Sequence, residues 1–178
     1  MQTNKKTPYY FTAIGLFILL KFAYTLADTY DLNFLLRPTD ILVGVLTGSN
    51  SVYLENSGFY HDKLNIIIDK SCSGFNFWLL CFLVFTYLVL KYLDKPLHKI
   101  LALPSVLFCS YLLTIFVNTS RIFASIIVQN QVQRFISNKY QVILHEIIGI
   151  ITYLSFLVLT YYIFEKFLNY RQYNAKPA

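Results

Sequence analysis

Cys72 is the residue of this chain best suited to nucleophilic chemistry. It lies in the run Asp-Lys-Ser-Cys-Ser-Gly of residues 69–74, where a polar segment enters a long apolar one. If a helix begins there, its unpaired N–H groups and the positive end of its dipole stabilise a thiolate, and Lys70 adds a positive charge. Gly74 leaves room for a substrate backbone to approach closely. The alternative is an ordinary small residue at a helix end.

Two residues elsewhere could complete a catalytic set. His145 opens an apolar run, and an imidazole there can serve as base to a thiol, with Gly149 removing bulk from the same face. Arg121 closes another apolar run, where its permanent charge could hold a carboxylate or stabilise an oxyanion, oriented by Asn118. The alternative is that both are ordinary interfacial residues whose polar ends lie among the lipid headgroups.

The composition indicates a membrane protein, and the apolar runs of the sequence predict the helices that position these residues. Of 178 residues, 56% are hydrophobic and only 13% are charged, too few to cover a soluble globule. Long apolar runs predict four membrane-spanning helices, because about 20 residues cross a hydrocarbon core of about 30 Å. We place these spans at about 9–27, 73–90, 100–118 and 146–164.

The connections outside these spans are a long loop, 28–70, and a second loop, 121–144. Within the long loop we expect an interfacial or re-entrant helix at 32–48, followed by a small external hairpin. Residues 122–136 either lie along the surface or extend the third span as one long tilted helix. The fold class is therefore all-α, a polytopic transmembrane helical bundle that forms one integral membrane domain over residues 1–178.

Basic residues beside the spans predict the orientation, because positively charged flanks stay in the cytoplasm. Three basic segments belong on that side: Lys5 and Lys6; Lys91, Lys95 and Lys99; Lys166, Arg171 and Lys176. The charge count ignores the three candidate residues, yet it brings Cys72, Arg121 and His145 to one outer face. A nucleophile, a base and a cation form a working set for acyl transfer. An extra crossing at 32–48 would move Cys72 to the cytoplasmic side.

The sequence predicts neither a metal nor a cofactor. His61 and His98 fall on opposite sides of the membrane in this topology, and no Cys/His spacing is typical of zinc. The cysteines Cys72, Cys81 and Cys109 do not form a disulfide framework, because two of them lie inside apolar runs. Nothing in the pattern indicates a nucleic-acid partner.

Three short blocks occur in order beside the last three spans: Cys72-Ser73-Gly74, Asn118-x-x-Arg121 and His145-x-x-x-Gly149. They resemble the signature blocks of the exosortase/archaeosortase family of membrane transpeptidases. The resemblance covers Ser71 to the end of the fourth span. Typical members have about twice as many spans, so the chain is similar to the compact members, such as exosortase K.

The resemblance implies that Cys72 attacks a peptide bond near the carboxy-terminal sorting signal of a substrate and holds the product as a thioester. His145 would be the acid/base and Arg121 the stabilising cation, with supporting roles for Ser73, Gly74, Asn118 and Gly149. The partners implied are membrane-protein substrates with a tripartite signal, the lipid bilayer, and a lipid or polysaccharide acceptor. The implied location is the bacterial cytoplasmic (inner) membrane, with the active site facing the periplasm or exterior.

Other functions fit the residues as well. In a non-catalytic membrane assembly or scaffold protein, the same side chains would only satisfy interfacial polarity. In a purely hydrolytic intramembrane cysteine protease, water would replace the acceptor. A transporter or channel would carry charges deep within its spans, and Lys21 is the residue that comes nearest to this.

Overall fold

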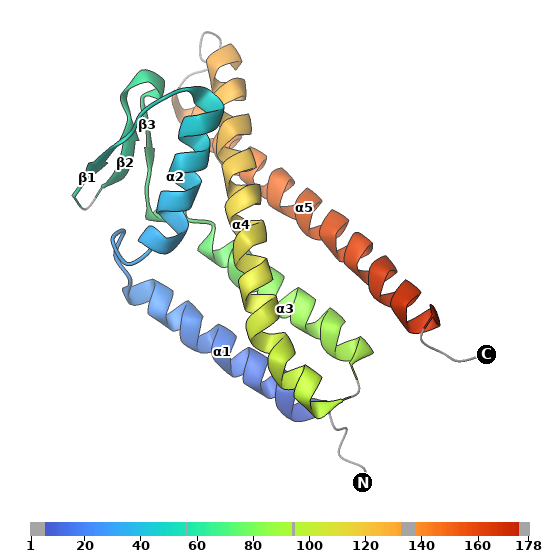
Figure 1. The fold of residues 1–178 in the computed structure, drawn as a ribbon. Helices are drawn as coiled ribbons and strands as arrows, with labels where there is room; N and C mark the ends of the chain where they lie inside the picture. Colours follow the sequence, from blue (N-terminus) through green and yellow to red (C-terminus); the bar gives the residue numbers. More distant parts are fainter. Residues whose placement is uncertain (1–5, 56, 94, 133–137, 175–178) are drawn as a thin grey trace.

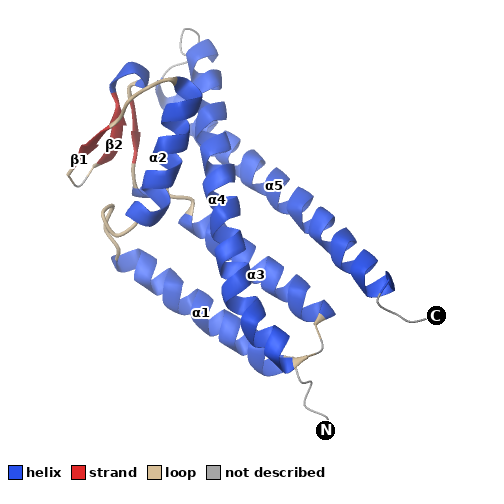
Figure 2. Ribbon diagram, viewed as in Figure 1, coloured by secondary structure: helices blue, strands red, loops and turns tan. Residues whose placement is uncertain are grey.

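The computed structural model describes residues 6–55, 57–93, 95–132 and 138–174. These residues form five α-helices and one small antiparallel sheet (Figures 1 and 2). In chain order the elements are α1 (Thr7–Leu26), α2 (Asn33–Thr47), β1 (Val52–Leu54), β2 (Gly58–His61), β3 (Ile66–Ile68), α3 (Phe75–Tyr92), α4 (Pro96–Val132) and α5 (Asn138–Asn174). Two 3-10 turns, η1 (Asp62–Leu64) and η2 (Lys70–Cys72), flank β3. The predicted fold class, a helical transmembrane bundle, is confirmed.

Four of the helices are long and apolar enough to cross a membrane. They are α1, α3, α4 and α5, and each covers one of the four predicted spans to within two residues at its ends. The start of α1, the end of α3, the start of α4 and the end of α5 lie toward the same end of the bundle (Figure 1). The chain is therefore a membrane protein in which the predicted basic segments adjoin one end of the spans.

α4 continues well past the length of one span. Its 37 residues correspond to a rod of about 55 Å at the α-helical rise of 1.5 Å per residue. The segment 122–136 therefore extends the third span as far as Val132, whereas residues 133–137 lie outside the described part of the chain. The predicted loop 121–144 is to this extent wrong. No glycine or proline interrupts 119–132, so nothing in that stretch breaks the helix.

α2 does not cross the membrane. Its 15 residues extend about 22 Å, which is shorter than a hydrocarbon core of about 30 Å. The Lys70 ammonium donates to the carbonyl of Ala27 at 2.6 Å, so the chain returns to the level at which α1 ended. Cys72 is thus at the same face of the bundle as the end of α1, as the predicted interfacial helix at 32–48 requires.

The sheet adds one strand to the predicted hairpin. β1 pairs with β2 through Tyr53 and Phe59, and β2 pairs with β3 through Tyr60 and Ile67, in the order β1-β2-β3. We call α2 and this sheet, residues 33–68, the cap. It covers the part of α4 that extends beyond the end of α1 (Figure 1).

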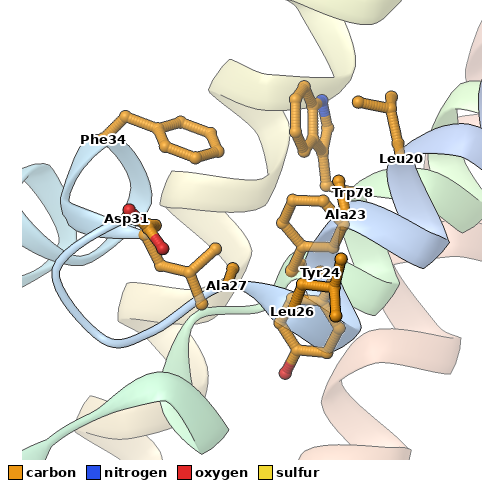
Figure 3. Close-up of a pocket in the computed structure, with 10 residues that line it drawn as sticks. Leu20, Ala23, Tyr24, Leu26, Ala27, Asp31, Phe34 and Trp78 are labelled. Carbon is orange, nitrogen blue, oxygen red and sulfur yellow. The ribbon is translucent and has the colours of Figure 1, made fainter.

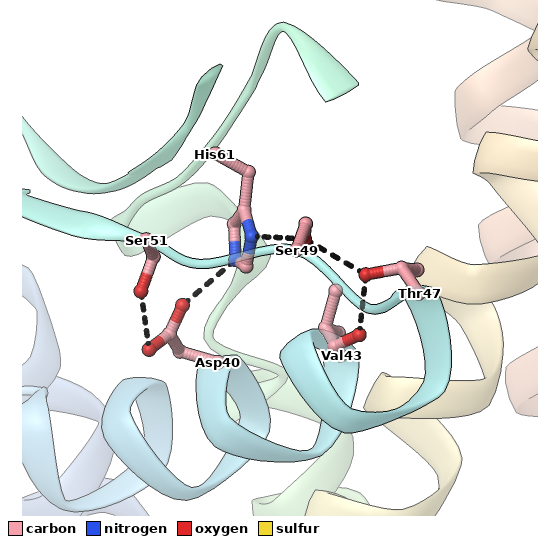
Figure 4. Close-up of polar contacts among 6 residues, drawn as sticks. All are labelled: Asp40, Val43, Thr47, Ser49, Ser51 and His61. Carbon is pink, nitrogen blue, oxygen red and sulfur yellow. Dashed lines mark hydrogen bonds and ion pairs between the residues drawn. The ribbon is translucent and has the colours of Figure 1, made fainter. Parts of the chain in front are cut away.

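A buried polar network holds the cap together. The His61 ring, fully buried on β2, bonds through Nε2 to the Asp40 carboxylate of α2 at 2.8 Å, and its Nδ1 contacts the Ser49 hydroxyl at 2.7 Å (Figure 4). The Ser51 hydroxyl donates to the other Asp40 oxygen at 2.9 Å, and Ser49 is linked in turn to Thr47 at 2.8 Å. These bonds give nearly every polar atom of the network a partner, which is what burial demands.

We expect the substitution Asp40→Ala to destabilise the protein by on the order of 3 kcal/mol, because it leaves a buried imidazole and a hydroxyl without their acceptor. Thermal unfolding in lipid-supplemented detergent measures the loss. The matched control is Asp28→Ala, at an exposed carboxylate in the α1–α2 connection. Equal melting temperatures for the two variants would contradict the structural role of the network.

Candidate active site

Cys72 lies in a backbone turn that its neighbours fix. The Asp69 carboxylate accepts hydrogen bonds from the amides of Ser71 at 2.9 Å and Cys72 at 3.3 Å, which orders η2. The Ser73 hydroxyl then accepts from the Phe75 amide at 3.4 Å, as α3 begins. Cys72 is the last residue of η2, and Ser73 and Gly74 separate it from Phe75, so it lies just ahead of α3 and not in the first turn of that helix, as the prediction had it.

The structure explains the glycine at position 74 differently from the sequence, which suggested room for a substrate backbone. Its φ of 70° is left-handed, and a Cβ there would come within 3.1 Å of the Thr114 methyl and 3.2 Å of the Asn118 side chain. The free space at Gly74 is therefore taken by α4 and not by a substrate backbone. Gly74 lets the start of α3 pack closely on α4 beside Cys72.

Arg121 of α4 joins the other two candidate residues. Its Nη2 donates to the Cys72 sulfur at 3.6 Å and to the His145 Nε2 at 3.1 Å. Because a guanidinium can only donate, His145 accepts through Nε2 and is a neutral imidazole in this arrangement. The structure therefore brings together the predicted nucleophile, base and cation from η2, α4 and α5.

A second chain of bonds closes a ring around the cluster. The Arg121 Nη1 donates to the Tyr153 hydroxyl at 3.0 Å, and this hydroxyl donates to the Asn118 Oδ1 at 2.7 Å. The Asn118 Nδ2 then donates to the backbone carbonyl of Cys72 at 2.5 Å. Asn118 therefore orients Arg121 through Tyr153, where a direct bond was expected, and it also anchors the Cys72 backbone.

Sequence reasoning missed Tyr153. Its ring stacks on Phe77 of α3 with centroids 4.6 Å apart, which holds the hydroxyl in place. The signal was the four-residue spacing of His145, Gly149 and Tyr153, which puts all three on one face of α5. Gly149, between them, faces Arg121, because a Cβ there would lie 3.5 Å from the Arg121 Cδ.

Lys70 does not supply the positive charge expected beside Cys72. Its ammonium bonds to the Ala27 carbonyl and lies 5.0 Å from the centre of the Tyr24 ring. Lys21 lies 5.3 Å from the centre of the same ring and donates to Asn76 at 2.6 Å, so it pairs with α3 at an exposed position. The cation in contact with the sulfur is Arg121.

The charge of Arg121 lacks the usual counterion. The residue is 7% exposed, and among the described residues the ion pairs within 4.0 Å do not include its guanidinium. Its Nε also has no hydrogen-bond partner in that part of the chain. A buried cation without a carboxylate favours a negative charge on the nearest group that can carry one. The Cys72 sulfur lies 3.6 Å from the Arg121 Nη2 and is one of the groups that this buried cation contacts.

A small cavity of about 40 Å³ adjoins the cluster. We call it the site cavity. Cys72 and His145 form part of its wall, and the isoleucines of β3 form another part. α4 closes it with Ile122, Ser125, Ile126 and Gln129. A group that entered this cavity would lie beside both the nucleophile and the base.

A larger pocket of about 470 Å³ lies between the ends of α1, α2 and α3 (Figure 3). Its walls are mostly apolar and include Leu20, Tyr24, Phe34 and Trp78, with Asp31 as a charged member. Cys72, Arg121 and His145 are not among its lining residues. The three candidate residues are therefore not part of this pocket, whereas Cys72 and His145 both line the site cavity.

Other potential ligands are dispersed. Within the described ranges, no group of three or more His, Cys, Asp or Glu side chains could hold a metal ion. Cys81 is fully buried in α3, Cys109 is exposed on α4, and both are free thiols. These two cysteines provide internal references for the reactivity of Cys72.

We expect Arg121→Gln to lower the rate of Cys72 alkylation by iodoacetamide at least about tenfold, because the variant removes the positive charge that contacts the attacking sulfur. Peptide mass spectrometry quantifies the adduct on Cys72 relative to that on Cys109. Arg171→Gln, at an exposed arginine at the end of α5, serves as the matched control. An unchanged rate in Arg121→Gln would mean that the guanidinium does not activate the sulfur.

No protein-family model, curated protein or solved structure matches the chain.

Proposed function

We propose that the protein is a membrane-embedded cysteine transpeptidase or protease that cleaves a carboxy-terminal sorting signal through a Cys72 thioester. One observation carries the proposal: Cys72, Arg121 and His145 come from three separate segments and meet beside one cavity. Interfacial polarity alone gives no reason for a thiol, an imidazole and a buried guanidinium to converge. The exosortase-like order of the three blocks points to the same chemistry.

The first step is attack on the substrate carbonyl. The neutral His145 takes the proton of the Cys72 thiol as the sulfur forms a bond to the carbonyl carbon. The carbonyl oxygen then carries the negative charge, and Arg121, which contacts both Cys72 and His145, stabilises that charge. Asn118 keeps the Cys72 backbone fixed during the approach.

The second step expels the amine. The tetrahedral intermediate collapses, the carbon–nitrogen bond breaks, and His145 returns its proton to the leaving nitrogen. The amino-terminal part of the substrate remains as a thioester on Cys72 and the sorting signal departs. A lipid or polysaccharide amine or hydroxyl then attacks the thioester and releases the thiol, or water does so in the hydrolytic variant.

The depth of the cluster suits such a substrate. Cys72 lies at the level where α1 ends, since Lys70 bonds to Ala27, and the spans of α3 and α5 run from it toward the opposite end of the bundle. A substrate whose apolar helix lies in the bilayer beside the enzyme would present its cleavage site at that interface. The basic flanks support the assignment of this end to the periplasm or exterior of a bacterial inner membrane.

We expect a cysteine at Glu55, in the cap, to react with a membrane-impermeant maleimide in intact cells, because the cap lies at the proposed outer end. The matched variant Lys95→Cys, between α3 and α4, should react only after the cells are permeabilised. Gel-shift labelling in a Cys72→Ser, Cys109→Ser background separates the two, because the remaining thiol, Cys81, is fully buried. The reverse pattern would place the site in the cytoplasm.

We expect Cys72→Ala to abolish processing of a co-expressed substrate that carries a tripartite carboxy-terminal signal, a loss of at least about 10³-fold, because no other group can form the thioester. Immunoblotting of substrate and product measures it, and Cys109→Ala, at an exposed thiol outside the site, should process normally. Unchanged processing in Cys72→Ala would favour the non-catalytic scaffold.

The same experiment distinguishes transfer from hydrolysis. Mass spectrometry of the new carboxy terminus should find it joined to an acceptor, because a transpeptidase passes the acyl group to a second nucleophile. A free carboxylate on every product molecule would rule out transfer and leave the hydrolytic protease.

A further inference from the structure

One edge of β3 has no partner strand in the described part of the chain. The sheet order is β1-β2-β3, so β3 pairs with β2 along one edge only. Among the same residues, the backbone hydrogen bonds made outside the helices and the sheet do not involve Ile66, Ile67 or Ile68. An edge of this kind leaves N–H and C=O groups available to another extended chain.

The pairing with β2 determines which groups point to this free edge. In an antiparallel pair, one residue turns both its N–H and its C=O toward the partner strand, and the next residue turns both away. A Cβ built on Gly58 of β2 would collide with the Ile68 carbonyl oxygen, so Ile68 faces β2. Ile67, the residue before it, therefore presents its N–H and its C=O at the free edge.

The free edge borders the site cavity. Ile66, Ile67 and Ile68 all line this cavity, although the side chains of a strand alternate between its faces, with Ile68 1% exposed and Ile67 46% exposed. Consecutive residues share one wall when the edge of the strand, and not one of its faces, forms that wall. Cys72 and His145 line the same cavity. A chain that lies along β3 thus comes within reach of the nucleophile and the base.

We propose that the free edge of β3 is the docking site for the substrate, whose segment on the acyl side of the scissile bond binds there as an added strand. The inference rests on the proposed function. The apolar helix of the sorting signal follows the scissile bond and lies in the bilayer, so the residues before the bond extend toward the cap. The Ile67 N–H donates to a substrate carbonyl, and a substrate N–H donates to the Ile67 carbonyl.

Backbone pairing determines what this docking site can select. It requires an extended segment and does not read a side chain directly, so different side chains are accepted at the paired position. Proline is excluded there, because its nitrogen carries no proton to donate to Ile67. The docking site thus selects on backbone conformation.

The first comparison measures Cys72 modification in two variants of the full-length protein. Ile67→Pro removes the N–H at the free edge and leaves the bonds to β2 in place, whereas Ile67→Ala changes the same side chain and keeps the N–H. With acetyl-Ala-Ala-Ala chloromethyl ketone, the Cys72 thiol loses its proton and the sulfur displaces chloride. We expect this reaction to be at least about fivefold slower in Ile67→Pro than in Ile67→Ala. Iodoacetamide, which has no peptide backbone, should react equally with both.

The second comparison uses the wild-type protein. In an ester analogue of the ketone, lactic acid replaces each alanine, which removes the N–H groups and keeps an extended chain. We expect the analogue to modify Cys72 at least about fivefold more slowly than the peptide, because it cannot donate to the Ile67 carbonyl. Each rate is divided by the rate with glutathione, which corrects for the intrinsic reactivity of the two reagents, and peptide mass spectrometry follows the adducts.

The outcomes separate the docking site from the proposed function. Equal corrected rates in either comparison would overturn docking at β3, while modification of Cys72 by the ketones leaves the nucleophile in place. Failure of both ketones to modify Cys72, with iodoacetamide still reacting, would overturn the proposed function and the docking site with it. The wild-type comparison decides alone if Ile67→Pro does not fold.

Discussion

A guanidinium keeps its charge at any accessible pH, and Arg121 carries that charge into a place where little water reaches it. The surrounding structure must therefore offer acceptors from several directions, and it does so with Cys72, His145 and Tyr153. These acceptors belong to different helices, so the need to solvate one side chain aligns η2, α4 and α5 at one depth. Because Gly149 has no side chain, the aliphatic part of Arg121 can pass close to α5.

The bundle and the cap contribute different residues to the site. The bundle supplies the reactive groups, and the ring from Arg121 through Tyr153 and Asn118 to the Cys72 backbone keeps them in register. The cap supplies β3, which forms one wall of the site cavity. The bridge between Asp40 and His61 ties α2 to the sheet that carries that wall. Under the proposed function, the bundle would supply the reactive groups and the cap would supply part of the surface that meets the substrate.

The sequence predicted the features that follow from local rules. Hydrophobic length gave the four spans, and helix-end chemistry together with charge counting led to Cys72, Arg121 and His145. It could not decide where α4 ends, because the mixed polar and apolar residues after Arg121 fit a helix lying along the membrane surface as well as a continuation of α4. Tyr153 and the true partner of Lys70 depend on contacts between helices far apart in the chain, which a single sequence does not contain. The third strand likewise needed its pairing with β2 to be recognised.

The bond between Lys70 and Ala27 closes a segment whose ends adjoin in space although 43 positions separate them in the chain. The cap is then an insertion into a four-helix unit. The two chain segments that connect it to that unit lie side by side. The cap nevertheless shares one hydrophobic core with the bundle, in which Leu36 and Ile68 belong to the same buried cluster as Cys72, Trp78 and Ile126. A chain with another cap would keep the order of the four spans, but its new cap would have to fill the same core beside the sulfur.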